Sequence, residues 1–356
     1  MTEAITQYGS LVREMLRRAA VERQPAYGIF ELTGRCNLSC RMCYVRCAAG
    51  DRKTAAKELS AAAWLDLATQ AVDNGMVFLL LTGGEVFLRR DFFEIYEPLT
   101  RMGLVLALFT NGTLITEDLA GRLAEAPPSC TEITLYGASA GVYETVTGVA
   151  GSYKACCSGI DALVTRGVPL GLKTTITRHN VHELEAMRRM ARNWGVPFSA
   201  GWLLSRRPDG APSDVEDCRL SAADCVELEA TDQASAHEWT EAALRHDTSG
   251  DHDNFRCHAG KSAFVIDPAG AMNACLVLPQ PAARPLENGF GEAWDQVRQY
   301  VDSAAPPAPG CRACNVLEYC GRCPAWAMME TGTLTEPVPY LCEIARARKE
   351  RYGNPV

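Results

Sequence analysis

The chain has 356 residues, of which 47% are hydrophobic and 22% charged, a composition typical of a folded protein with room for two or three domains. Its net charge of -8 argues against binding to nucleic acid or to an anionic membrane, because those functions rest on a basic surface. The sequence has no long uncharged apolar run and no signal peptide, so we expect a cytoplasmic protein without a membrane-spanning helix.

Residues 1–26 are expected to form an amphipathic helix, because apolar side chains recur there at helical spacing. From residue 27 onward, β-like runs alternate with helix-like stretches. Strands are expected over residues 28–33, 77–82, 105–110, 132–136, 169–177 and 196–204. Helices are expected over residues 60–74, 90–102, 117–123, 152–166 and 182–194. This alternation predicts parallel strands with right-handed crossovers, and hence an α/β sheet or barrel with fewer strands than a closed eight-stranded barrel.

The rest of the chain divides into two regions. Residues 206–255 are polar and acidic, with Pro208, Gly210 and Pro212, and are expected to form a linker or bridging region. From Cys257 onward the chain is rich in Pro and Gly and holds seven of the sixteen cysteines. We therefore expect an irregular C-terminal domain over residues 256–356 that needs cross-links to fold. Without an export signal, so many cysteines favour metal binding or catalysis over disulfides.

Three cysteines follow the first expected strand in CxxxCxxC spacing, namely Cys36, Cys40 and Cys43. Three thiolates this close can hold three irons of a 4Fe-4S cube and leave the fourth iron open to a ligand. A zinc site is the alternative, with Cys47 as a fourth ligand. The second expected strand ends in the run TGGE over residues 82–85, where glycines allow a ligand to approach the backbone and a carboxylate can bind an ammonium group.

Together, the cysteine triplet and the GGE run resemble the radical SAM superfamily over about residues 27–205. The resemblance implies a partial (β/α)6 barrel in which Cys36, Cys40 and Cys43 hold a 4Fe-4S cluster. It also implies that the cluster binds S-adenosylmethionine (SAM) and cleaves it reductively to a 5′-deoxyadenosyl radical. Expected contacts to SAM are Tyr44 at the adenine, Gly83, Gly84 and Glu85 at the methionine amino group, and Thr82, Asn111, Thr134 and Lys173. Thr134 stands where peptide-modifying relatives have Ser, and Lys173 adds a positive charge for the SAM carboxylate.

The C-terminal cysteines form a second pattern, which alone would also fit zinc ribbons built on two Cys pairs. The pattern resembles the SPASM extension of radical SAM enzymes, which carries two auxiliary 4Fe-4S clusters, for three clusters in all. The resemblance assigns Cys257, Cys275 and Cys323 to the inner cluster, and Cys311, Cys314, Cys320 and Cys342 to the outer one. The inner cluster then lacks a fourth cysteine, and the position is either open to substrate or filled by a residue such as His258 or Asp251.

The runs over residues 135–139, 143–154 and 321–332 look most like radical SAM/SPASM maturases of ribosomally made peptides. The resemblance implies hydrogen abstraction from a peptide C–H bond, followed by oxidation to a thioether or carbon–carbon crosslink. It also implies a flavodoxin- or ferredoxin-type electron donor. Only 26 residues precede the expected barrel, so a leader peptide would need a separate binding protein.

Two other readings of the sequence stay open. One is a SPASM oxidase or epimerase of a small molecule such as a sugar or aminocyclitol, or a sulfatase-type maturase. The other is a non-catalytic iron–sulfur or zinc protein that carries electrons or organises structure.

Overall fold

The computed structural model describes residues 2–244 and 254–353. Its main feature is one eight-stranded sheet with the strand order β10-β9-β1-β4-β5-β6-β7-β8. The strands are β1 (Tyr27–Thr33), β4 (Phe78–Gly83), β5 (Val105–Thr110), β6 (Cys130–Thr134), β7 (Leu170–Thr175), β8 (Phe198–Gly201), β9 (Ala263–Ile266) and β10 (Met272–Asn273). All neighbouring strands run parallel except β9 and β10. The six strands expected from the sequence are therefore confirmed, in chain order, from β1 to β8.

Helices surround the sheet. They are α1 (Thr2–Glu22), α2 (Arg52–Ala55), α3 (Ala61–Asp73), α4 (Phe92–Leu99), α5 (Glu117–Glu125), α6 (Ala140–Thr147), α7 (Ser152–Thr165), α8 (Leu184–Trp194), α9 (Val215–Cys218), α10 (Ala222–Thr231), α11 (Gln233–Leu244), α12 (Pro285–Asn288), α13 (Phe290–Asp302), α14 (Pro309–Arg312), α15 (Pro324–Thr331) and α16 (Pro339–Tyr352). Short 3-10 turns are η1 (Val86–Leu88), η2 (Val181–Glu183) and η3 (Leu317–Tyr319), and a two-stranded ribbon joins β2 (Arg35–Cys36) to β3 (Cys47–Ala48).

The crossover helices begin at residues that the sequence marks as N-caps. Ser60, Thr116 and Ser139 each accept a hydrogen bond from a backbone N–H in the first turn of α3, α5 and α6. Such caps stabilise a helix by about 1 kcal/mol each. The buried faces of these helices pack on the sheet, as where the rings of Phe30 and Trp64 lie 4.9 Å apart. The packed α/β core therefore sets the positions of the strand ends, and the candidate site lies at those ends.

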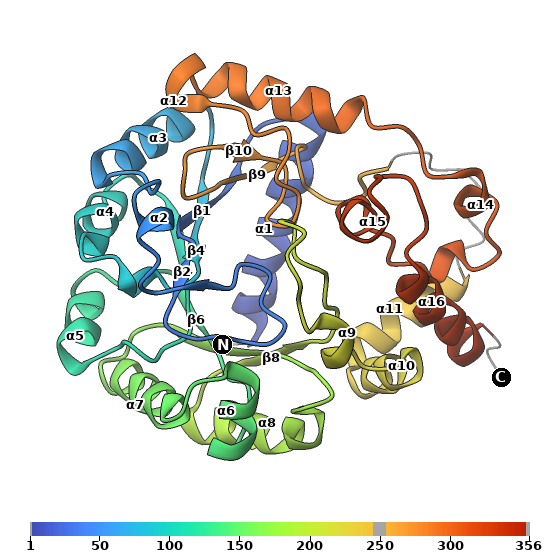
Figure 1. Cartoon of the computed structure of the whole chain (residues 1–356), viewed down its shortest axis with the longest axis horizontal. Coiled ribbons are helices and arrows are strands. Elements are labelled where there is room, and N and C mark those ends of the chain that lie inside the picture. Colours follow the sequence, from blue (N-terminus) through green and yellow to red (C-terminus); the bar gives the residue numbers. More distant parts are fainter. Residues whose placement is uncertain (1, 245–253, 354–356) are drawn as a thin grey trace.

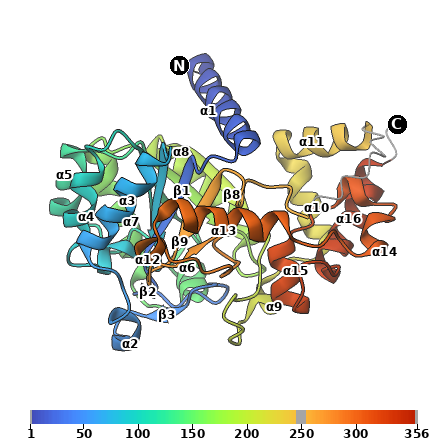
Figure 2. The same ribbon diagram turned by 90° about the horizontal axis from the view of Figure 1, so that it is seen from above.

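Figure 1 shows the strands as an incomplete barrel with α3 to α8 on its outside and α14 to α16 beside α10 and α11 at one edge. Figure 2 shows α1 projecting from the body of the molecule, which agrees with the exposed fractions of Leu11 (57%) and Val21 (74%). The expected α/β partial barrel is therefore confirmed. In the described parts of the chain, no helix is long and apolar enough to cross a membrane.

Three features depart from the expected secondary structure. The sheet continues past β1 into β9 and β10, because residues 263–266 pair in parallel with residues 27–30. The region expected to be a linker contains α9, α10 and α11, and the region expected to be irregular contains α13 and α16. α10, α11 and α16 show no strong amphipathic spacing, and α10 and α16 instead pack against each other. The sequence analysis overlooked α13, whose buried residues recur at helical spacing, namely Phe290, Ala293, Trp294, Val297 and Val301.

Candidate active site

A cavity of about 360 Å³ lies at the carboxyl ends of the parallel strands. Its lining brings together every residue predicted to hold the first cluster or SAM except Glu85. These are Cys36, Cys40, Cys43, Tyr44, Thr82, Gly83, Gly84, Asn111, Thr134 and Lys173. The remaining lining comprises Leu38, Met42, Val45, Phe109, Thr110, Tyr136, Thr175, Leu203, Leu204, Ser205 and Leu276. Parallel α/β folds place ligand sites at this end of their strands.

The three cysteines of the loop after β1 form the chemical centre of this cavity. Burial raises the pKa of Cys36 to about 11 and raises the pKa of Cys40 further, and the neighbouring thiols add to both shifts. Backbone N–H groups of Leu38 and Arg46 donate to the sulfurs of Cys36 and Cys43 at 3.4 and 3.3 Å. A thiol that resists losing its proton becomes a thiolate when a metal centre supplies compensating positive charge. Three cysteines beside a cavity of this size fit a 4Fe-4S cluster with one open iron.

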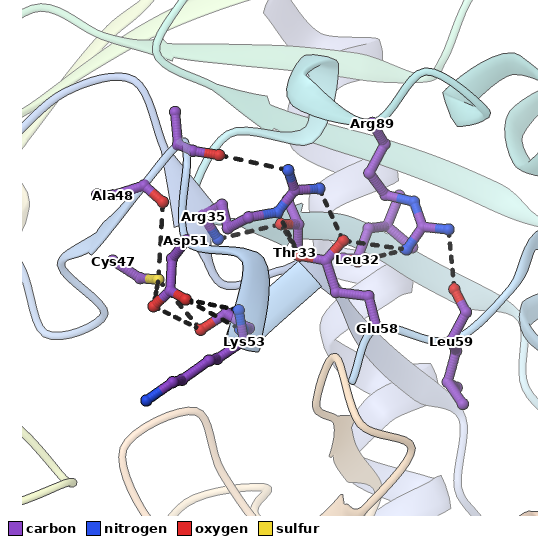
Figure 3. Close-up of polar contacts among 12 residues, drawn as sticks. Leu32, Thr33, Arg35, Cys47, Ala48, Asp51, Lys53, Glu58, Leu59 and Arg89 are labelled. Atoms are coloured by element: carbon purple, nitrogen blue, oxygen red, sulfur yellow. Dashed lines mark hydrogen bonds and ion pairs between the residues drawn. The ribbon is translucent and has the colours of Figure 1, made fainter. Parts of the chain in front are cut away.

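A buried ion network braces the start of this loop (Figure 3). The guanidinium of Arg35 donates two hydrogen bonds of 2.8 Å to the carboxylate of Glu58. Arg89, which follows η1, donates to the carbonyl oxygens of Leu32 and Leu59 at 2.9 Å. Because Arg35 directly precedes Cys36, the network ties the position of the first cysteine to β1 and to the end of β4.

The two glycines after β4 are needed for packing as well as for ligand approach. Gly83 has φ +135°, and a Cβ on it would lie 2.3 Å from the carbonyl oxygen of Thr33. A Cβ on Gly84 would lie 2.2 Å from the carbonyl oxygen of Arg35. The backbone N–H of Gly84 donates to Thr33 at 2.7 Å. The GGE run therefore packs directly against the chain that leads into the cysteine loop.

Glu85 is buried and lies outside the lining of the cavity. Its side chain is fully buried and accepts hydrogen bonds from Thr110 Oγ1 at 2.8 Å, from the N–H of Asn111 at 2.8 Å and from the N–H of Phe87 at 3.2 Å. Burial raises the pKa of this carboxyl group. Glu85 does not line the cavity, and its contact with the SAM amino group stays a prediction. Its carboxylate instead holds the end of β5 against the end of β4.

Lys173 projects from β7 into the cavity, but its ammonium group already has partners. The nitrogen lies 3.0 Å from Glu132 and 2.8 Å from the ring centre of Phe109. Burial lowers the pKa of Lys173 to about 8, although Glu132 opposes that shift. The side chain is therefore a cation that loses its charge just above neutral pH.

Asn111 and Tyr44 are fixed by neighbours. The amide nitrogen of Asn111 donates to Asn37 Oδ1 at 2.9 Å and lies 3.7 Å from the sulfur of Cys36. The hydroxyl of Tyr44 donates to Glu31 at 3.2 Å. Burial raises the pKa of Glu31 to about 7. Sequence analysis missed Glu31, whose only signal is an acidic residue inside an otherwise apolar strand.

Tyr136 is a second residue without a predicted role. It lines the cavity, and its pKa is raised well above the usual range by burial and then by the nearby Cys40, Cys43 and Cys36. Cys47 does not line the cavity, and its thiol donates to Asp51 and Thr54 at 3.5 and 3.3 Å (Figure 3).

The C-terminal cysteines influence one another's pKa values in two sets. Cys275, whose pKa burial raises to about 11, is close enough to Cys323 and Cys257 for their charges to add to the shift. The pKa of Cys320 is raised by burial and then by Cys342, Cys314 and Cys311. Of the residues proposed to complete the inner group, His258 is exposed and its Nδ1 lies 2.9 Å from Ser262 Oγ; Asp251 lies outside the described residues.

Over residues 2–244 and 254–353, no three or more His, Cys, Asp or Glu side chains converge on a position for one metal ion. A 4Fe-4S cube spreads its thiolates around a larger body than a zinc ion does. In each of the three sets, the thiols lie near enough to one another to contribute to one another's pKa shifts.

Residues 30–191 match the radical SAM superfamily, and these residues carry β1 to β7 and almost all of the cavity's chemistry. This part of the chain is therefore a radical SAM domain.

The chain is similar to three named proteins. The chain is 26% identical over 344 residues to the AdoMet-dependent heme synthase of Methanosarcina barkeri, covering 90% of this chain and 97% of the relative. It is 28% identical over 320 residues to the mycofactocin maturase MftC of Mycobacterium ulcerans, covering 83% and 82%. The crystal structure of SuiB from Streptococcus suis superposes with a TM-score of 0.71 at 17% identity, covering 89% of this chain and 77% of SuiB, and so shares the fold.

Proposed function

We propose that this radical SAM enzyme oxidatively modifies a ribosomally made peptide, forming a thioether or a carbon–carbon crosslink. The observation that carries the proposal is the single cavity that gathers Cys36, Cys40 and Cys43 with the glycines after β4 and with Lys173. The similarity to a protein named mycofactocin maturase and the fold shared with SuiB, which has been solved bound to its precursor peptide SuiA, support a peptide as the substrate.

In this proposal, the three cysteines hold a 4Fe-4S cluster which, with SAM, supplies the 5′-deoxyadenosyl radical that takes a hydrogen atom from the substrate. The chain's own residues position the reactants. Gly83 and Gly84 would contact the amino group of SAM through their backbone atoms. Thr134 and Lys173 lie on the cavity wall where the carboxylate of SAM would bind. The apolar side chains of Leu203, Leu204 and Leu276 exclude water from the substrate side of the cavity.

The proposal extends to the C-terminal region. Cys257, Cys275 and Cys323 would hold one auxiliary 4Fe-4S cluster, and Cys311, Cys314, Cys320 and Cys342 another, giving three in all. A flavodoxin- or ferredoxin-type protein would donate electrons, and a separate protein would bind the leader of the peptide. A cytoplasmic location fits these partners, since they operate in a reducing compartment.

The test is a reaction of the anaerobically reconstituted enzyme with SAM, dithionite and synthetic peptides translated from short reading frames beside its gene. One of these peptides is expected to lose two hydrogen atoms by mass spectrometry and to accelerate formation of 5′-deoxyadenosine. A second candidate is a small-molecule substrate, favoured by the near-complete match to the heme synthase. Oxidation of a porphyrin or sugar in the same assay, with every peptide unchanged, would replace the peptide proposal.

The charge of Lys173 gives a pH dependence. Because the pKa of Lys173 is lowered to about 8 by burial, its ammonium group is present below that pH and is lost above it. If it binds the SAM carboxylate, the KM for SAM rises about tenfold between pH 7 and pH 9.5, a charge-assisted hydrogen bond being worth about 1.5–3 kcal/mol. Lys173→Met would have the high KM at every pH. A wild-type KM that is flat over this range would rule out the contact.

The outer cysteine group, which includes Cys342, is expected to be needed for peptide modification but not for the cleavage of SAM. Cys342→Ala should leave the formation of 5′-deoxyadenosine within about twofold of wild type and abolish the modified peptide, because Cys342 lies far along the chain from the first cysteine triplet but beside Cys311 and Cys314. Cys157→Ala, a cysteine of α7 outside all three groups, is the matched control. Unchanged peptide modification in Cys342→Ala would show that an outer cluster is not required.

A further inference from the structure

One edge of the eight-stranded sheet is open. Within residues 2–244 and 254–353, β8 is the last strand in the sheet order and pairs only with β7. The N–H of Leu172 and that of Ile176 bond the carbonyl oxygens of Pro197 and Gly201, so residues 197, 199 and 201 face β7. Because the hydrogen-bonding direction alternates along a parallel strand, the N–H and C=O groups of Phe198, Ala200 and Trp202 point away from the sheet.

The edge strand is short, with four residues, which is one of the devices by which proteins protect a sheet edge, but its sequence carries no other. The strand sequence FSAG contains no charge and no proline, whereas unprotected edges are normally blunted by lysine, proline or a covering element. A Cβ on Gly201 would meet nothing within 4 Å. An edge left open in this way is a template for one particular ligand, another extended backbone.

A groove of about 340 Å³ runs beside the open edge. Its lining is Ala200, Gly201, Trp202, Leu203, Glu229, Ser235, Glu238, Trp239 and Arg348, so α10, α11 and α16 form the wall opposite β8. That wall is fixed before anything binds. Arg348 and Glu229 form a buried ion pair, Arg348 lies 3.8 Å from the ring centre of Trp239, and Trp202 Nε1 donates to Glu229 at 3.3 Å. These contacts hold the groove in its shape before a ligand binds, and its lining includes the indole rings of Trp202 and Trp239.

The groove leads into the active-site cavity. Leu203 lines both spaces, and the next two residues, Leu204 and Ser205, line the cavity that holds Cys36, Cys40 and Cys43. Leu203 is 41% exposed, which makes it one of the few exposed large hydrophobic side chains in the described parts of the chain. A backbone that follows β8 in the direction of the strand therefore arrives at the cysteine triplet.

We propose that the substrate peptide binds as an added strand along the open edge of β8, with alternate side chains in the groove between Trp202 and Trp239, and that this pairing delivers the reacting residue past Leu203 into the cavity. The inference rests on the proposed peptide-modifying function and adds the docking site to it. A sugar or a porphyrin has no ladder of N–H and C=O groups to match β8, so the edge favours a peptide over a small molecule.

Hydrogen exchange of the wild-type enzyme, read residue by residue, tests the pairing without any variant. The probe is the synthetic peptide that the enzyme modifies. Its binding is expected to slow exchange of the backbone amides of Ala200 and Trp202 by about tenfold or more, because these amides gain partners. The amides of Ser199 and Gly201, already bonded to β7, serve as internal controls.

Two N-methylated forms of the same peptide supply matched ligands. One form is methylated at every second amide of the docking segment, and the other at the amides in between. Only one set of amides faces β8 in an added strand, so one form should show a KM raised about tenfold or more while the other binds like the parent, two lost hydrogen bonds being worth about 1–3 kcal/mol. Equal effects of both forms, or of neither, would overturn the strand pairing.

A groove-filling variant tests the location. Gly201→Val adds a side chain where the structure has open space, at a position without a positive φ, and should raise the KM for the peptide about tenfold. Gly141→Val, at an equally open glycine of α6 outside both cavities, should leave that KM unchanged. Gly201→Val with wild-type KM would overturn the proposal.

Failure of this inference differs from failure of the proposed function. A peptide that is modified while exchange over residues 198–203 stays unchanged would refute the docking site alone. If no peptide is modified, both are refuted.

Discussion

Replacing Cys36, Cys40 or Cys43 with alanine is expected to lower formation of 5′-deoxyadenosine from SAM by at least about a thousandfold. Each variant removes one of three ligands in the cavity wall, and a cluster bound by two cysteines is not retained in an arrangement that can cleave SAM. The measurement is chromatography of the products formed by anaerobically reconstituted enzyme with dithionite as the reductant.

The matched control for this series is Cys130→Ala. Cys130 lies on β6, outside all three cysteine groups, and is only partly buried. Its replacement should leave SAM cleavage within about twofold of wild type, since a small free cysteine acts mainly as an apolar side chain. Full activity in any of the three ligand variants would contradict the assignment of the cluster to this loop.

Gly84→Ala is expected to have the second-largest effect. A Cβ at Gly84 would lie 2.2 Å from the carbonyl oxygen and 2.6 Å from the carbonyl carbon of Arg35, and a backbone cannot move aside as a flexible side chain can. The loop that leads into Cys36 must therefore shift. We expect a loss of about 1–3 kcal/mol in stability and a loss of SAM cleavage of about a hundredfold or more, because small displacements of reacting groups cost rates of that order.

Gly50→Ala is the control for this prediction, because Gly50 follows β3, which pairs with β2 in the cysteine loop, and a Cβ there meets nothing within 4 Å. Both variants should be measured by thermal unfolding and by the KM for SAM. If Gly84→Ala matches Gly50→Ala in both measurements, the packing of the GGE run against the cysteine loop does not position the site.

The strands that bear the site could be predicted because each is a short apolar run next to a helix that crosses back over the sheet. Thus the loops carrying Cys36 and Gly83 were expected at the same end of the sheet, and the cavity brings them together. β9 could not be predicted, because its four residues pair with β1, which lies far away in the sequence. A run of four residues is too short for its local sequence pattern to reveal a pairing with a strand so far away in the sequence.

Glu85 illustrates what a sequence motif does not reveal, namely the hydrogen-bond partners of its side chain. The sequence places a carboxylate beside two glycines, but it does not reveal that the N–H of Asn111 and the hydroxyl of Thr110 turn that carboxylate into the core. The partner of Lys173 was missed for the same reason, because Glu132 lies on the neighbouring strand. The docking edge on β8 has no sequence signal at all, since it consists of backbone groups exposed by the end of the sheet.

The most direct test of the account is metal analysis of the anaerobically purified and reconstituted chain. The proposed ligands predict about twelve iron atoms and twelve sulfides per chain, in three cubes of four, with a brown colour that is lost in air. About eight of each would remove one auxiliary cluster from the account. A colourless protein that contains zinc and no iron would contradict its central claim, that Cys36, Cys40 and Cys43 hold an iron–sulfur cluster for SAM.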